Sequence, residues 1–470
     1  MTFNSVIFLF FFLPVVLLGS VLFQKKPLIK KAWLLLASFV FYGWCNTRIL
    51  AFLLLYGLAH YWLGCLLEAC ADRRTARNFL LIPGILLNVG CLFYVKYLNY
   101  TISLGNLLLG TAFPAVAGII VPLGISFLCF SMIAYLVDVY RGKTQALRDL
   151  IDFYLYLSFF PKISQGPITR HGDMANISLG RERTSLTVFS DGLRRFVAGL
   201  GKKVLIADIL GAAVDTVWGG VATGITSATA WTGILCYTLQ IYYDFSGYTD
   251  MAIGLANMLG FSLPENFDFP YLSKSVSEFW RRWHMTLGNW FKEYIYFPLG
   301  GSRKGTVRTI LNLCVVWLFT GIWHGAATNY VLWGIYFGCF VIIEKLIGKT
   351  NWYQRIPAVC KWACTFFLVM MGWVIFRSGS LAEMVSYFKL LANGSEAAIY
   401  GFGYYFDSSV YVSAVAGILF MLPWPEKLLT QVSDKPVAVV IRDLLLLCVL
   451  FLSVFFMLNS TYQSFIYFQF

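Results

Sequence analysis

Long apolar runs, separated by short polar and basic segments, fill most of the chain. Runs near the ~20 residues that a helix needs to cross a bilayer recur along its whole length. Outside the central block they cover about residues 6–23, 32–46, 48–69, 79–95, 115–137, 359–377, 407–422 and 439–458. With the runs of the central block, we expect roughly eleven membrane-spanning helices plus shorter re-entrant or interfacial helices.

The basic residues of the N-terminal half follow alternate apolar runs. They lie at Lys25 to Lys31, at Arg73 to Arg77 and at Arg141 to Lys143. Lysine and arginine concentrate in cytoplasmic loops, so this order places the N-terminus outside. The first run has no basic segment before it and no Ala-x-Ala-like site after it, so we expect a span and not a cleaved signal peptide. No polar linker divides residues 1–470, so we expect a single polytopic membrane domain.

A segment with two prolines and a glycine interrupts the apolar pattern at Ser158 to Arg170. Irregular backbone at membrane depth persists only where protein or water satisfies its polar groups. The segment therefore fits a re-entrant, cavity-lining piece, and it fits an ordinary interfacial loop equally well.

Two of the four histidines lie among tryptophans in a central block, residues 240–334. His284 belongs to residues 279–294, which we predict as one interfacial helix with an aromatic face and a cationic face. His324 lies in the almost uncharged run from Leu311 to Trp333, where an ionisable side chain marks a functional site by default. The glycines beside it, Gly321 and Gly325, leave room for a ligand near the backbone. The alternatives are a histidine that bonds a backbone group at 284 and one that joins two helices at 324.

Composition narrows the class of protein. Only 13% of residues are charged and 59% are hydrophobic, which excludes a soluble domain with its roughly 25% charged residues. The net charge of +13 lies in short loops, a pattern that fits membrane lipid headgroups and not nucleic acid. Eleven single cysteines without metal-ligand spacing predict neither a zinc site nor a disulfide framework, so we expect no metal.

The residue types of this block would allow a histidine to act directly as a general base on a hydroxyl that attacks a thioester. The chain has no Gly-x-Ser-x-Gly elbow and no His-Glu-x-x-His motif. A neutral imidazole can instead remove the proton of an attacking hydroxyl. Desolvation keeps a histidine neutral, and indole or amide N–H groups can stabilise the oxyanion. Candidate substrate-binding side chains are Trp283, Asn289, Trp323 and Asn329. Asp244 and Asp250 either orient a histidine, bind a polar substrate or join helices.

Several strings resemble the membrane-bound O-acyltransferase (MBOAT) family, specifically its bacterial branch for alginate O-acetylation and teichoic-acid D-alanylation. They lie at residues 243–254, 264–271, 278–284, 296–301 and 320–325, and weaker matches lie at 3–5, 122–127, 137–142 and 465–470. The resemblance implies an all-α integral membrane fold around a central funnel, in the bacterial cytoplasmic membrane. It implies a catalytic histidine at His324 and a second functional histidine at His284. The chain departs from the family pattern at Leu128 to Phe130 and at Ser164 and Gln165, which bears on donor or acceptor specificity.

The resemblance implies O-acetylation of a cell-envelope polysaccharide, with acetyl-CoA as donor substrate and no permanently bound cofactor. Transfer is direct or passes through an extracytoplasmic partner that resembles SGNH hydrolases. The alternatives are D-alanyl transfer to teichoic acid from a phosphopantetheine thioester on a carrier protein, and peptidoglycan O-acetylation. A different class, a secondary transporter or channel, would need an internal symmetry that the sequence does not show. The sequence leaves open the acceptor polymer and the oligomeric state.

Overall fold

The computed structural model describes residues 1–44, 46–174, 185–395, 398–424, 435–459 and 462. These residues form helices and connecting turns without a strand, which confirms the all-α prediction. The chain divides into two compact units, Met1–Phe196 with Tyr248–Glu265, and Val197–Gly247 with Asn266–Phe470. Two helices, α9 (Leu186–Gly201) and α11 (Ser227–Leu259), contribute residues to both units. The single domain over residues 1–470 therefore stays a prediction. The C-terminal string at 465–470 lies outside the described residues.

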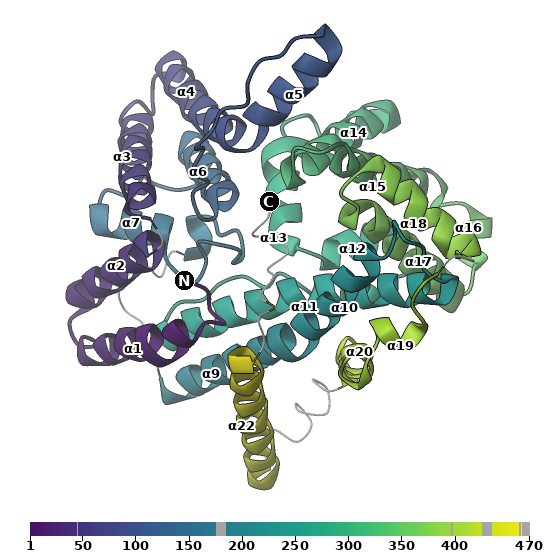
Figure 1. The fold of residues 1–470 in the computed structure, drawn as a ribbon. Coiled ribbons are helices and arrows are strands. Elements are labelled where there is room, and N and C mark those ends of the chain that lie inside the picture. Colours follow the sequence, from purple (N-terminus) through teal and green to yellow (C-terminus); the bar gives the residue numbers. More distant parts are fainter. Residues whose placement is uncertain (45, 175–184, 396–397, 425–434, 460–461, 463–470) are drawn as a thin grey trace. The chain divides into compact units, whose positions relative to one another are not determined.

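The first unit contains the helices near the N-terminus (Figure 1). They are η1 (Phe8–Phe12), α1 (Leu13–Leu22), α2 (Pro27–Gly43), α3 (Thr47–Ala69), α4 (Arg74–Leu92), η2 (Phe93–Tyr97), α5 (Leu98–Leu109), α6 (Ile125–Tyr140), α7 (Leu150–Ser158), η3 (Gly172–Met174) and most of α9 (Leu186–Gly201). Between α7 and η3, every residue from Phe159 to Thr169 is buried in turns. The predicted break is therefore present, and its depth in a membrane stays open.

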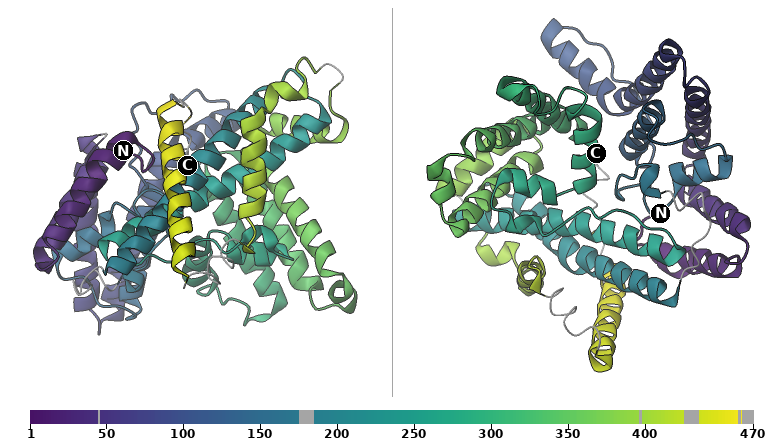
Figure 2. Two further views of the ribbon diagram at one scale, coloured as in Figure 1. Left: turned by 90° about the horizontal axis from the view of Figure 1, so that it is seen from below. Right: turned by 180° about the vertical axis from the view of Figure 1, so that it is seen from behind.

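The second unit contains the candidate chemistry. It is built from η4 (Lys202–Ala207), α10 (Asp208–Gly219), the first part of α11 (Ser227–Leu259), η5 (Pro270–Leu272), α12 (Val276–Arg282), α13 (Met285–Phe291), η6 (Lys292–Tyr296), α14 (Gly305–His324), α15 (Thr328–Ile347), α16 (Asn351–Arg355), α17 (Ala358–Arg377), α18 (Leu381–Asn393), α19 (Phe402–Tyr405), α20 (Ser408–Phe420) and α22 (Pro436–Asn459). In Figure 2, α22 is the long yellow helix, and it packs against η4.

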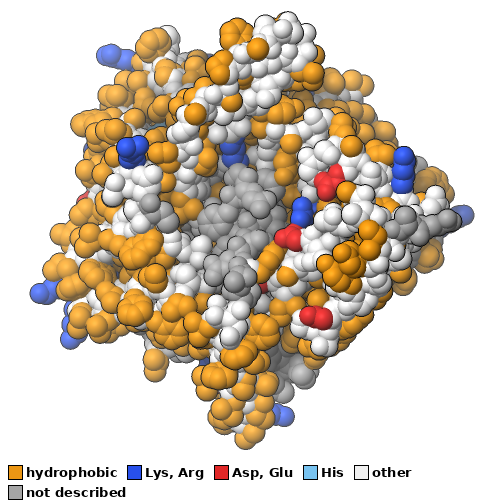
Figure 3. All heavy atoms as spheres, in the orientation of Figure 1, with side chains coloured by type: hydrophobic (Ala, Val, Ile, Leu, Met, Phe, Trp, Pro, Cys, Tyr) orange, Lys and Arg blue, Asp and Glu red, His pale blue; other side chains and the backbone are white. Residues whose placement is uncertain are grey.

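Six helical stretches of the described chain are long and apolar enough to cross a membrane. They are Thr47–Ala69, Arg74–Leu109, Gly305–His324, Thr328–Ile347, Ala358–Arg377 and Pro436–Asn459. Shorter apolar helices cover Phe8–Leu22, Ile125–Tyr140 and Ser408–Phe420. Large apolar side chains project from such helices, for example Leu107 and Phe79, and Figure 3 shows mostly apolar side chains on the face it displays. This surface fits lipid, while the count of roughly eleven spans stays a prediction.

Two predicted helix boundaries are wrong in an informative way. The run at 79–95 continues as helix to Leu109, and the next helix begins at Ile125 and not near 115. The second start is displaced because Gly124 adopts a left-handed backbone, with φ of 63°, directly before Ile125. An added Cβ at Gly124 would approach the carbonyl oxygen of Ile163 to 1.8 Å, so only glycine fits this approach.

Candidate active site

Helix α12 is anchored at its start by side chains that satisfy its free N–H groups. The Ser275 hydroxyl accepts a hydrogen bond from the Glu278 N–H at 3.0 Å, which is an N-cap. The Glu344 carboxylate of α15 accepts from the N–H groups of Val276, at 2.5 Å, and Ser277, at 2.8 Å. A negative charge at a helix N-terminus also interacts favourably with the helix dipole. The position of α12 is therefore tied to that of α15.

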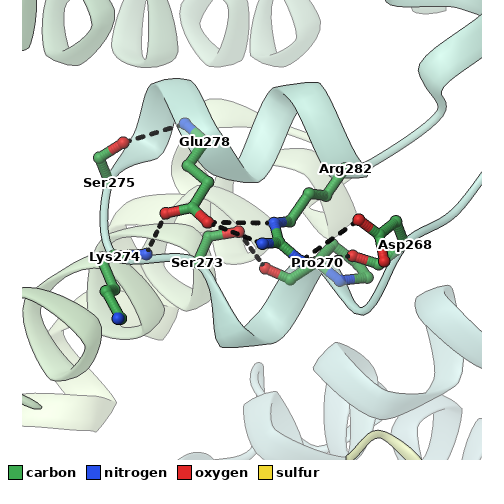
Figure 4. A network of polar contacts seen from close by, with 7 residues as sticks. All are labelled: Asp268, Pro270, Ser273, Lys274, Ser275, Glu278 and Arg282. Atoms are coloured by element: carbon green, nitrogen blue, oxygen red, sulfur yellow. Dashed lines mark hydrogen bonds and ion pairs between the residues drawn. The ribbon is translucent and has the colours of Figure 1, made fainter. Parts of the chain in front are cut away.

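A second set of polar contacts fixes the C-terminal end of α12 (Figure 4). The Arg282 guanidinium donates to Glu278 Oε1 at 3.1 Å and reaches Asp268 Oδ2 at 3.3 Å. Glu278 in turn accepts from the Lys274 N–H at 2.9 Å. Arg282 thus connects both ends of this short helix to the segment before it.

The chain bends sharply directly after α12, so the prediction of one helix over 279–294 is wrong. Trp283 is extended, and His284 has a left-handed backbone with φ of 44°. The Asp268 N–H donates to the Arg282 carbonyl, at 3.0 Å, and the Met285 N–H donates to the Asn266 carbonyl, at 2.9 Å. These bonds to a distant segment replace helical ones and hold a conformation that costs a non-glycine residue about 1–2 kcal/mol.

The His284 ring is oriented by an amide. Its Nδ1 lies 3.0 Å from Asn266 Oδ1, which also accepts from the backbone N–H of Thr286, at 3.2 Å, and from its hydroxyl, at 2.9 Å. A backbone N–H can only donate, so this oxygen is an acceptor, and Nδ1 carries the proton. The lone pair of the neutral ring is then on Nε2. His284 lies outside the candidate spans, and burial lowers its pKa to about 3, so the ring is neutral at physiological pH.

His324 is held by packing at the end of a helix. It is the last residue of α14 and is 3% exposed. Its ring meets the rings of Trp323, Trp333 and Phe376 edge to face, with centroids 4.7, 4.8 and 5.2 Å away. The nearly uncharged run from Leu311 to Trp333 contains the end of α14 at His324 and the start of α15 at Thr328.

The glycines near His324 serve helix packing and not ligand approach, which corrects the expectation from the sequence. An added Cβ at Gly321 would lie 2.6 Å from the Tyr330 carbonyl oxygen, and one at Gly334 would lie 2.5 Å from that of Trp317. At Gly325 it would lie 2.5 Å from the Tyr330 ring. Small residues let two helices approach closely, as here for α14 and α15.

Both histidines line one pocket of about 410 Å³ in the second unit, a size that suits a small-molecule ligand. Aromatic side chains form much of its wall, and none of the described lining residues is acidic. The rest of the lining includes Ser277, Trp280, Arg281, Trp283, Leu287, Asn289, Lys292, Thr320, Trp333 and Trp373. Trp323 lies beside His324 and has its ring 6.4 Å from that of His284. The bend at His284 and the end of α14 thus bring together residues 40 positions apart.

The pocket contains some of the predicted substrate-binding residues. Trp283 and Asn289 line it. Trp323 contacts both histidine rings without lining it, and Asn329 uses its amide to donate to the Ser378 carbonyl at 2.8 Å. Asn329 therefore connects α15 to the end of α17. The roles assigned to all of these residues stay predictions.

The two aspartates are engaged in ion pairs away from the pocket lining. Lys203, with a fully buried side chain, has its Nζ 2.6 Å from Asp244 Oδ1 and 2.6 Å from Asp208 Oδ1. Asp250 pairs with Arg195 at 2.9 Å, and Arg195 also pairs with Glu265. Of the alternatives weighed for these acids, joining helices fits these contacts, because a buried charge needs a partner.

Sequence reasoning missed three residues of this site. Asn266 orients His284, and Trp280 and Trp333 line the pocket. The indole Nε1 atoms of Trp280 and Trp333 are buried and have no hydrogen-bond partner among the described residues. Such donors are costly to leave unpaired and are available to an oxygen acceptor. All three residues lie in or near the matched strings, but only the bend at residues 283–284 gives them a common location.

The arrangement can perform base chemistry on a bound ligand without a nucleophilic side chain of the protein. It supplies two buried imidazoles, aromatic walls and unpaired indole donors. Among the described residues, no group of three or more His, Cys, Asp or Glu side chains is placed to hold a metal ion.

The chain matches one family model and is similar in sequence to several known proteins. The family model described as MBOAT, membrane-bound O-acyltransferase family, matches residues 145–381, which include both histidines. The chain is 41% identical over 385 residues to a probable alginate O-acetylase of Pseudomonas putida, covering 81% of this chain and 78% of the relative. It is 33% identical to a peptidoglycan O-acetyltransferase of Helicobacter pylori (82% and 79% covered). It is 28% identical to a teichoic acid D-alanyltransferase of Bacillus subtilis (54% and 68% covered).

Proposed function

This chain belongs to the membrane-bound O-acyltransferase family, and we propose that it moves an acetyl group from acetyl-CoA for O-acetylation of a cell-envelope polysaccharide. It is an O-acyltransferase and a multi-pass membrane protein. The observation that carries the proposal is the pocket that His284 and His324 share. An alginate-like acceptor is supported by the likeness to the probable alginate O-acetylase, which is greater than the likeness to the peptidoglycan and teichoic acid enzymes.

In the proposed reaction, His324 is the general base. Its neutral ring takes the proton of the acceptor hydroxyl as the hydroxyl oxygen attacks the thioester carbonyl carbon. The new C–O bond forms, the carbonyl oxygen becomes an oxyanion, and the C–S bond then breaks. The leaving thiolate takes the proton back from the imidazolium, so the base is regenerated. The products are an acetyl ester and the free thiol.

The surroundings of the ring support this role. Aromatic edges surround the His324 ring, so little water can compete with a bound hydroxyl for its nitrogen atoms. The indole N–H groups of Trp280 and Trp333 are candidates for donors to the oxyanion, because neither has an acceptor among the described residues. His284, held by Asn266, is assigned a supporting role in placing the substrate.

Delivery to the polymer completes the proposal. The donor enters from the cytoplasm, with the N-terminus outside and the protein in the bacterial cytoplasmic membrane. The acetyl group passes to the polymer directly or through an extracytoplasmic partner that resembles SGNH hydrolases. A carrier-protein thioester is the alternative donor, and mass analysis of the modified polymer separates acetyl from D-alanyl esters.

The test replaces the proposed base in the full chain and measures acetyl esters on the envelope polysaccharide by NMR. We expect His324→Ala to lower O-acetylation by about 100- to 10,000-fold, the range for a general base, at unchanged protein level. The control is His171→Gln, because His171 does not line the pocket. Normal acetylation by His324→Ala would refute the role of His324. D-alanyl esters in place of acetyl esters would refute the donor.

A further inference from the structure

Two cationic side chains line the same pocket as the histidines. Arg281 lies near the end of α12, and Lys292 lies at the start of η6, on either side of the bend at His284. Both residues are exposed, whereas the histidines are buried. The pocket therefore has a cationic, solvent-accessible part and a buried part with aromatic and imidazole groups.

Arg281 differs from its neighbour in how its charge is used. Arg282 pairs with Glu278 and Asp268 (Figure 4), which makes it part of the α12 anchor. Arg281 forms no ion pair with a carboxylate within the described part of the chain, and it lines the pocket instead. Of the two adjacent arginines, Arg282 therefore forms ion pairs within the protein, and Arg281 is available to a ligand.

Lys292 is also without a carboxylate partner among the described residues. Its Nζ lies 5.6 Å from the centre of the Phe297 ring, a weak cation–π contact that leaves its three donors available. No Asp or Glu among the described residues lines the pocket, so the described lining has no carboxylate to neutralise the two positive charges. A pocket lined by one sign of charge attracts ligands of the opposite sign.

We propose that Arg281 and Lys292 bind phosphate of the acyl donor, a phosphopantetheine thioester, while its pantetheine arm lies along the aromatic wall toward the histidines. This inference rests on the acyl transfer proposed above and identifies where the donor is held. A guanidinium matches the geometry of phosphate oxygens, and a lysine acts beside it as a point charge. The apolar wall of Trp280, Trp283 and Leu287 suits the uncharged arm.

A phosphopantetheine thioester has two sources in a cell, coenzyme A and the phosphopantetheine of a carrier protein. Both carry a phosphate on the 4′ oxygen of pantetheine, and coenzyme A carries further phosphates. The test therefore compares three donors of increasing charge: acetyl-pantetheine, acetyl-phosphopantetheine and acetyl-CoA. Acetyl-pantetheine has the same thioester and arm but no phosphate.

The variants are Arg281→Gln, Lys292→Gln and the double variant of the full chain in membranes. For each single variant we expect KM for the phosphorylated donors to rise about 3- to 30-fold, since charge-assisted bonds at an exposed site are partly screened. KM for acetyl-pantetheine and kcat for all donors should not change. Equal losses with acetyl-CoA and acetyl-phosphopantetheine assign the pair to the 4′ phosphate, and a larger loss with acetyl-CoA assigns it to the further phosphates.

Two controls separate this effect from general ones. Lys349→Gln removes one exposed charge that does not line the pocket, and it should leave all three KM values unchanged. Arg282→Gln loosens α12 and should affect the three donors alike. An equal KM change for acetyl-pantetheine and acetyl-CoA in Arg281→Gln and Lys292→Gln would overturn the phosphate site.

A direct measurement of binding tests the phosphate site independently of the proposed acyl transfer. Binding of coenzyme A itself is measured by calorimetry on the solubilised chain, with pantetheine as the uncharged comparison. We expect the double variant to lose about 10- to 100-fold in affinity for coenzyme A, with a loss that shrinks at high salt. Unchanged affinity would overturn the site. The double variant could lose affinity for coenzyme A and not for pantetheine, while the unaltered chain transfers no acetyl group. That pair of results would support the phosphate site and refute the proposed transfer.

Discussion

His284 and His324 line the same pocket, but different forces hold their rings. His284 lies in a bend between two short helices, with a left-handed backbone and a hydrogen bond to Asn266. His324 ends a long apolar helix and is surrounded by aromatic edges. A hydrogen bond selects one tautomer of a ring, and edge-to-face packing fixes the plane of a ring. The comparison indicates an imidazole with its tautomer set by Asn266 at 284 and an imidazole enclosed by aromatic rings at 324.

The strongest test of the difference between the two histidines is to remove each ring in turn. We expect His324→Ala to reduce the initial rate of acetyl transfer by about 100- to 10,000-fold, and His284→Ala to reduce it less, by about 10- to 100-fold. The reason is that the first loses the proposed base and the second a supporting contact. Rates are measured with acetyl-CoA at equal amounts of folded protein. A greater loss in His284→Ala would reverse the assignment.

Asn266→Ala should act through His284 alone. It removes the acceptor of the Nδ1 proton, and we expect a loss of about 10-fold in rate, because a free ring samples other orientations and tautomers. In a His284→Ala background the same change should cost almost nothing further, since coupled residues are not additive. Full additivity of the two losses would show that Asn266 acts elsewhere.

The burial of His284 predicts a dependence of stability on pH. Its pKa is about 3 in the folded chain against an ordinary 6.5, so the unfolded chain takes up the proton first as pH falls. Stability is therefore complete above about pH 6.5 and decreases from there toward pH 3. In His284→Gln, we expect the loss between pH 7.5 and 5 to be smaller by about 2 kcal/mol. Thermal unfolding in detergent at both pH values measures it, and equal losses in both proteins would contradict the prediction.

The last comparison uses matched glycine substitutions beside the two histidines, and the smallest expected effect is that of Gly288→Ala. Gly321→Ala places a methyl group 2.6 Å from the Tyr330 carbonyl oxygen and should destabilise the chain by about 1–3 kcal/mol. Gly288→Ala, in α13, meets only the Trp280 carbonyl oxygen at 3.6 Å. It should stabilise by about 0.5–1 kcal/mol, because alanine favours helix. Melting temperatures compare them, and equal shifts would mean that α14 and α15 do not pack closely at Gly321.

Much of this protein is predictable because membrane helices leave a local signal. Apolar length identifies α3 and α17 to within one residue and α22 to within three, since a helix satisfies its own backbone and needs only an apolar surface. Residue types within a few positions also single out His284 and His324 as unusual. These features depend on neighbours along the chain, so a sequence contains them in full.

Contacts between segments that are distant in the sequence determine the features that the sequence alone does not predict. The bend at His284 exists because residues 266–268 form backbone hydrogen bonds with Arg282 and Met285. No local pattern at residues 279–294 predicts this bend. Likewise, Asp244 pairs with Lys203 across 41 positions. The clearest case is Arg281 beside Arg282. The two are identical in type and adjacent in sequence, yet one pairs with Glu278 and Asp268 and the other lines the pocket, because the direction of a side chain depends on where its helix is anchored.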